Sequence, residues 1–118
     1  MSQFGEYIRK RREELQQANP SRFSLRKVAQ EADIEPSYLS KIERGLQPPP
    51  GQATIEALAL VLEEDKDVML ALAGKVSDDL SKIIQKRPKL FATLIRELKD
   101  MPDKAVLRLV REVRDGEW

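Results

Sequence analysis

Apolar side chains recur every three to four residues along most of the chain, and this spacing predicts α-helices. A first helix is expected over residues 3–17, with its apolar stripe formed by Phe4, Ile8 and Leu15. Ser24 is a good N-cap for a short second helix, whose inner face carries Val28, Ala29 and Ala32. After a turn at Asp33 and Ile34, a third helix is expected to begin near Glu35-Pro36 and to end at Gly45, with Leu39 and Ile42 inward.

The same spacing continues beyond Pro48-Pro49-Pro50-Gly51, which is read as a stiff linker. A fourth helix is predicted over residues 53–62 and a fifth over residues 66–73, which stops at Gly74. Residues 75–118 form a second block of three short helices, the first capped by Ser77 and the others opened by Pro88 and Pro102. The predicted fold class is therefore all-α, with a domain boundary between residues 1–74 and residues 75–118.

The amino-acid composition excludes several classes of functional site. The 118 residues contain no Cys and no His, so disulfides, thiol or imidazole metal sites and triad hydrolases are excluded. The acidic runs Glu63-Glu64-Asp65 and Asp78-Asp79 read as a loop and a helix start, so neither an enzyme nor a metal or other cofactor is expected. With 21 Lys+Arg against 20 Asp+Glu, any binding to nucleic acid must come from a local patch. No segment is apolar for long enough to span a membrane, and a cytoplasmic location is expected.

The most informative segment runs from Ser24 to Gly45, SLRKVAQEADIEPSYLSKIERG. Two short helices joined by a turn of about three residues, with the small Ala29 at their crossing, match helix-turn-helix spacing. Such a unit pushes the start of its second helix outward, where it fits a DNA major groove.

This segment resembles the Cro/C1-type (Xre) helix-turn-helix transcriptional regulators, above all in the run Tyr38-Leu39-Ser40-Lys41-Ile42-Glu43-Arg44-Gly45. The resemblance covers about residues 4–74 and implies a five-helix, lambda-repressor-like domain followed by the C-terminal block. The family usually has Gly in the turn where this chain has Asp33, which is expected to take up a left-handed conformation at modest cost.

The resemblance implies that residues 35–44 form the recognition helix and that its base-reading side chains are Ser37, Tyr38 and Lys41. Tyr38 has a second interpretation as a half-buried core aromatic. Glu35 would be repelled by phosphates, so it is expected to cap the helix, with a contact to cytosine N4 as the alternative. Phosphate contacts are expected on both sides of the groove, from Ser24, Leu25, Arg26, Ser40, Arg44, Gly45 and Gln47, partly through the backbone N–H groups of residues 45–47.

Arg12 and Glu43 have a structural role by the same resemblance, as a partly buried ion pair between the first and third helices. Either partner left alone would be an uncompensated charge, which costs more than the pair itself contributes.

Specific binding by one such unit is weak, so a homodimer on a two-fold-symmetric operator is expected. The predicted dimer interface is the apolar surface of the C-terminal block, made of Leu90, Phe91, Leu94, Ile95, Leu98, Val106, Leu109, Val110 and Val113. Packing of this surface onto the first five helices is the alternative. Trp118 is expected either to close the interface or to be disordered.

The sequence thus predicts a regulator that binds double-stranded DNA, acting as a repressor. The alternative is an antitoxin-like protein whose C-terminal block binds a protein partner, such as a toxin, while its DNA binding is autoregulatory. A metallopeptidase is a further partner that the resemblance allows.

Overall fold

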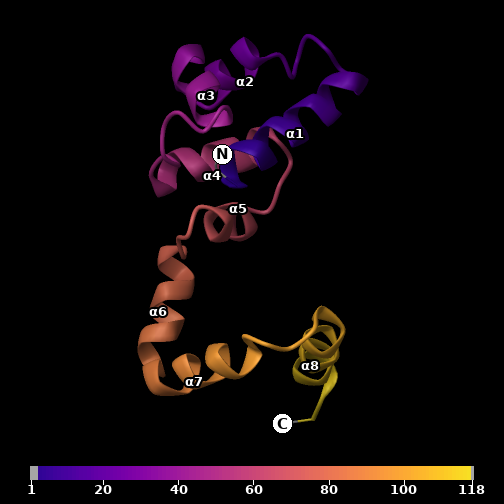
Figure 1. The fold of residues 1–118 in the computed structure, drawn as a ribbon, viewed down its shortest axis with the longest axis vertical. Coiled ribbons are helices and arrows are strands. Elements are labelled where there is room, and N and C mark those ends of the chain that lie inside the picture. Colours follow the sequence, from indigo (N-terminus) through magenta and orange to yellow (C-terminus); the bar gives the residue numbers. More distant parts are fainter. Residues whose placement is uncertain (1–2, 118) are drawn as a thin grey trace. The chain divides into compact units, whose positions relative to one another are not determined.

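The computed structural model describes residues 3–117, and within that range the chain forms eight α-helices and no strands (Figure 1). In order they are α1 (Gln3–Ala18), α2 (Leu25–Glu31), α3 (Pro36–Glu43), α4 (Gln52–Val61), α5 (Lys66–Leu72), α6 (Asp78–Lys86), α7 (Pro88–Leu98) and α8 (Asp103–Asp115). The all-α prediction is confirmed, and the predicted helices agree with these bounds to within a residue or two. Trp118 lies outside the described residues.

The chain divides into two compact units, the first ending at Ser77 and the second beginning at Asp78. The sequence placed this change after Gly74. The next residues belong to the first unit because the ammonium of Lys75 donates a 2.7 Å hydrogen bond to the carbonyl of Pro50, and because Ser77 is buried.

The first unit, α1–α5, is built around one hydrophobic core. Figure 1 shows α2 and α3 next to each other, with α1 beside them and α4 and α5 completing the bundle. The core consists of Phe4, Ile8, Phe23, Val28, Ala29, Ala32, Leu39, Ile42, Ile55, Leu58, Ala59, Leu62, Met69 and Leu70. Burial of each large side chain in such a core contributes about 1.5–3 kcal/mol, so the core fixes how α3 sits on the other helices.

The turn between α2 and α3 has the expected chemistry. The hydroxyl of Ser24 accepts a 3.1 Å hydrogen bond from the backbone N–H of Lys27 and so caps α2. Asp33 takes up the left-handed conformation, with φ of 59°. The N–H of the next residue, Ile34, then donates to the carbonyl of the fully buried Ala29. These contacts set the direction in which α3 leaves the turn.

Gly5 allows α1 to lie directly against the end of α3. A Cβ atom at this position would overlap the carbonyl oxygen of Ile42 and lie 3.2 Å from that of Glu43. Both oxygens belong to backbone, which cannot move aside as a flexible side chain can. The close contact of α1 and α3 therefore requires glycine here.

The second unit, α6–α8, has a different character. None of its described residues, 78–117, is buried to the extent of the first unit's core. Its large exposed apolar side chains are Leu80, Ile83, Leu90, Leu94, Ile95, Met101, Leu107, Val110 and Val113. The strong apolar pattern of these helices therefore does not end in a closed core within the second unit.

No helix between residues 3 and 117 has the combination of length and apolar character needed to cross a bilayer.

Candidate nucleic-acid interface

The core holds α3 by one face and leaves its other face outward. Leu39 and Ile42 are each 1% exposed, whereas Ser37 and Lys41 are exposed. Two of the three predicted base-reading residues thus present their side chains to solvent. Tyr38, the third, is half-buried and packs against the core, in line with its second interpretation.

Glu35 occupies the N-cap position of α3, but its side chain makes no capping hydrogen bond. The expectation that this carboxylate caps the helix is therefore wrong. The N–H groups of Tyr38 and Leu39 instead donate to the backbone carbonyl of Glu35, at 3.0 and 3.1 Å, as the first helical turn forms. The side chain stays exposed, and among the described residues it forms no ion pair.

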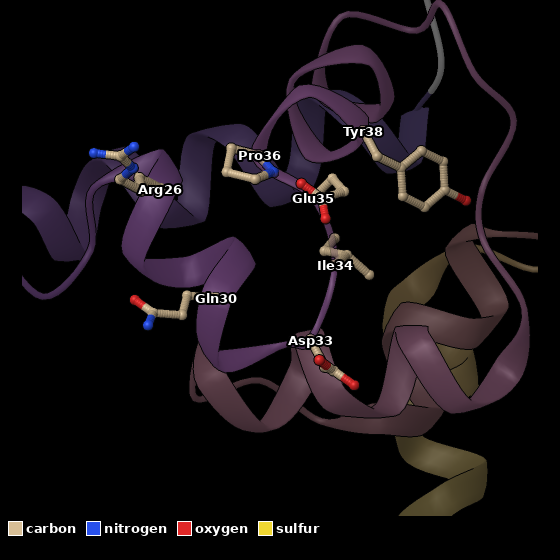
Figure 2. A pocket seen from close by; sticks show the side chains of 7 residues that line it. All are labelled: Arg26, Gln30, Asp33, Ile34, Glu35, Pro36 and Tyr38. Carbon is tan, nitrogen blue, oxygen red and sulfur yellow. The ribbon is translucent and has the colours of Figure 1, made fainter.

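A hollow of about 740 Å³ lies where α2, the turn and the start of α3 meet, and it is lined by Arg26, Gln30, Asp33, Ile34, Glu35, Pro36 and Tyr38. Figure 2 shows Arg26 and Gln30 extending from α2 on one side, and Tyr38 extending from α3 on the other side of Glu35. Gln30 was not singled out from the sequence, and the structure places it exposed on α2.

The start of α2 carries the first set of residues that were predicted to bind DNA phosphates. Arg26 is exposed, and Ser24 is half-buried with its hydroxyl used in the helix cap. Leu25 packs its side chain against the core. It is the first residue of α2, where the backbone N–H has no partner within the helix.

The end of α3 carries the second set of predicted phosphate-binding residues. Here the structure differs from the expectation that the backbone N–H groups are free to bind phosphate. The N–H groups of Gly45 and Leu46 donate to the carbonyls of Ile42 and Lys41, at 3.1 and 2.8 Å. Gly45, with φ of 74°, makes this C-terminal cap possible. These two amides are therefore used inside the protein and are not free phosphate ligands.

Exposed side chains at the end of α3 remain available to bind phosphate. Arg44 and Gln47 are exposed, and the Nε of Arg44 donates to the carbonyl of Ser40 at 3.3 Å. Ser40 itself is half-buried. The guanidinium of Arg44 keeps its other N–H donors for a ligand, because only Nε is used in this contact.

Arg12 and Glu43 form a buried ion pair with two contacts, from Nε to Oε2 at 2.8 Å and from Nη2 to Oε1 at 2.9 Å. Nη1 of Arg12 also donates to the carbonyl of Phe23 and to the amide oxygen of Gln16. The hydrogen bond with Glu43 raises the pKa of Arg12, against the lowering effect of burial. With Arg12 only 8% exposed, this pair acts on the protein's own helices.

Within residues 3–117, no cluster of three or more acidic side chains is placed to hold a metal ion. The surface offers hydrogen-bond donors and positive charge together with the carboxylates of Asp33 and Glu35, and donors and positive charge suit a polyanion with readable base edges.

Comparison with known proteins identifies the first unit. The family model described as a helix-turn-helix domain matches residues 3–72. No curated protein and no solved structure matches the chain. The match covers more than half of the chain and all of α1–α5. With α2, the Asp33 turn and α3 arranged as such a motif requires, the chain belongs to the family of helix-turn-helix domains, which bind DNA.

Proposed function

We propose that this chain is a non-enzymatic transcriptional regulator of the Cro/C1 (Xre) type, acting in the cytoplasm on a specific double-stranded operator. The observation that carries the proposal is the outward position of Ser37 and Lys41 on a helix whose opposite face is locked in the core. The N-terminal part of such a recognition helix contacts base edges in the major groove. Lys41 donates hydrogen bonds and is suited to guanine O6 and N7.

Contacts to phosphates position the domain in this proposal. Arg26 and the N–H of Leu25 serve one side of the groove, and Arg44 with Gln47 serves the other. These groups bind every sequence alike, because phosphates carry no sequence information. In this proposal Ser24 and Ser40 contribute to phosphate binding mainly through their backbone, since both side chains are half-buried.

The protein acts as a homodimer in this proposal, and as a repressor because a bound dimer occludes a promoter. The exposed apolar side chains of α7 and α8 support this, since the second unit by itself leaves them uncovered. The interface proposed from the sequence includes Leu90, Leu94, Ile95, Val110 and Val113, which are 44–66% exposed in a single chain. A second copy on the two-fold-related half-site would double the sequence that is read.

The same exposed surface supports a second candidate function, in which the C-terminal unit binds a different protein, as an antitoxin does. Stoichiometric co-purification of a protein encoded nearby, with loss of self-association in its presence, would favour this candidate. A purified chain that is dimeric alone and binds its operator without a partner favours the regulator.

The decisive experiment is selection of bound sequences from a random pool of double-stranded DNA. We expect a two-fold-symmetric consensus with half-site centres about 34–36 Å apart, and affinity that falls steeply as salt rises from about 50 to 200 mM. Lys41→Glu should abolish the enrichment. Lys82→Glu, the same charge reversal at an exposed position of α6, should leave it intact. No enriched sequence with the wild type, or the same sequences with Lys41→Glu, would contradict the proposal.

A further inference from the structure

We infer that Glu35 is a specificity-determining residue that accepts a hydrogen bond from an exocyclic amino group in the major groove, cytosine N4 or adenine N6. This inference rests on the proposed function and names a base contact within it. Glu35 stands at the N-cap of α3, the end of a recognition helix that lies closest to the base edges.

The internal role that would explain this carboxylate is missing. Its side chain makes no cap hydrogen bond with α3, and among residues 3–117 it has no cation within ion-pair distance. The backbone carbonyl of Glu35 already satisfies the N–H groups of the first turn. A side chain with Asp, Ser or Thr chemistry would cap this helix better than Glu does, so helix formation gives no reason for glutamate here.

The surroundings of Glu35 point toward a ligand. Its side chain lines the hollow of about 740 Å³ between α2 and α3, beside Arg26, Gln30 and Tyr38 (Figure 2). The next residue, Pro36, has no polar side-chain atom, so Glu35 and Ser37 supply the polar side chains at the entry of the helix. Asp33 lines the same hollow from the turn, so Glu35 is the ionisable acceptor at the N-cap of α3 itself.

A carboxylate such as that of Glu35 only accepts hydrogen bonds, so it can recognise only a base that presents a donor. In the major groove, guanine presents two acceptors and thymine presents an acceptor and a methyl group, whereas only cytosine and adenine present an amino donor. A carboxylate pushed into the groove is repelled by phosphates and by the acceptors of guanine, and its charge is offset only where an amino group faces it. Glu35 at the N-cap of α3 thus complements Lys41, a donor-only group about one and two-thirds turns further along.

The test compares selection profiles of the full-length protein. Wild type should enrich cytosine or adenine at one position of each half-site. Glu35→Ala should lower that preference by about tenfold, in line with the worth of a good base contact. Glu35→Gln, whose amide both accepts and donates, should shift the preference toward adenine. Glu31→Gln is the matched control, because Glu31 is exposed at the end of α2 and does not line the hollow. Its profile should equal that of the wild type.

Base analogues then identify the donor. Removing the amino group from the selected base, with pyrimidin-2-one for cytosine or purine for adenine, should weaken wild-type binding about tenfold. The same removal should change binding of Glu35→Ala by less than about twofold, because its partner is already gone.

Two results would overturn the assignment while leaving the proposed function intact. One is an unchanged base profile in both Glu35 variants, with affinity raised for all sequences alike, which would make Glu35 merely repulsive. The other is an equal loss on amino-group removal in wild type and Glu35→Ala. A wild-type protein that selects no site would contradict the proposed function and this assignment together.

Discussion

The guanidinium of Arg12 and the carboxylate of Glu43 meet in a buried two-point ion pair that ties α1 to α3, with Nε–Oε2 and Nη2–Oε1 distances of 2.8 and 2.9 Å. Glu43 is the last residue of α3, and the two exposed residues Ser37 and Lys41 lie on the same helix. The pair therefore fixes the far end of the proposed recognition helix.

Removing one partner of this pair should be costly. Glu43→Ala leaves Arg12 charged and buried, and we expect the free energy of unfolding to fall by about 3–5 kcal/mol. The double variant Arg12→Met/Glu43→Leu should lose less, because it leaves no unpaired charge. Urea denaturation followed by circular dichroism measures both. As a control, Glu13→Ala breaks the exposed Arg9–Glu13 pair and should change stability by less than about 1 kcal/mol. A double variant less stable than Glu43→Ala would contradict this account.

Gly5→Ala should destabilise the first unit by about 1–3 kcal/mol, the usual cost of overpacking. The added methyl group would overlap the carbonyl oxygen of Ile42, and the backbone of α3 would have to shift. Gly51→Ala is the matched control, since a Cβ there meets no atom within 4 Å and the φ of −68° suits any residue. Thermal unfolding compares the two variants. Equal unfolding midpoints for Gly5→Ala and Gly51→Ala would show that the close contact of α1 and α3 does not contribute to stability.

The sequence predicted most of the fold because its strongest signals are local. Ser24 as a cap, Pro36 at a helix start and Gly45 at a helix end each act within a few residues, and each lies where it was expected. Gly5 was missed because its reason is the carbonyl of Ile42, far along the chain, and no local pattern reveals such a contact.

The site was predicted less completely, for the same physical reason. Periodicity placed Ser37 and Lys41 outward, but whether Tyr38 contacts the core depends on neighbours from other helices. The amides of Gly45 and Leu46 looked free for phosphate until the C-terminal cap was seen to use both. Glu35 was expected to cap α3, and only the geometry of its side chain shows that it does not.

Tyr7 should titrate above the ordinary tyrosine range. Burial raises the pKa of Tyr7 first, and its hydrogen bond and proximity to Glu64 raise it further. A folded-state pKa above the unfolded value means that this contribution to stability is present below the ordinary value near 10 and is lost as the pH rises through the folded value. Ultraviolet titration of Tyr38→Phe isolates Tyr7, because the sequence has two tyrosines.

The control for this titration is the same protein with Glu64→Gln. Losing the carboxylate should move the pKa of Tyr7 back toward its ordinary value, while the part of the rise due to burial remains. A Tyr7 that titrates like free tyrosine in the folded Tyr38→Phe protein would contradict the contact with Glu64.

Lys41→Ala and Arg44→Ala should weaken DNA binding in different ways. Lys41 is proposed to contact a base, so its loss should cost about 1–3 kcal/mol on the selected site and relax the preference at one position. Arg44 is proposed to contact phosphate, so its loss should weaken all sequences alike and reduce the salt slope by about one. Fluorescence anisotropy on matched and mismatched duplexes at several salt concentrations separates them. An unchanged selectivity in Lys41→Ala would remove that residue from the base contacts.

Ile95→Glu should separate the proposed dimer while leaving each first unit folded. Ile95 is 58% exposed on α7, so a single chain tolerates the charge, whereas a dimer interface would bury it unpaired. Thr93→Glu, on the same helix and also exposed, is the control with the same added charge, and it should remain dimeric. Truncation after Ser77 keeps Lys75 and its hydrogen bond to Pro50, and should give a folded monomer with poor operator affinity. Light scattering measures the mass of each species and circular dichroism its helicity. A truncated protein that is still dimeric would place the interface on the first unit instead, and a wild type that is monomeric at every concentration would remove the dimer altogether.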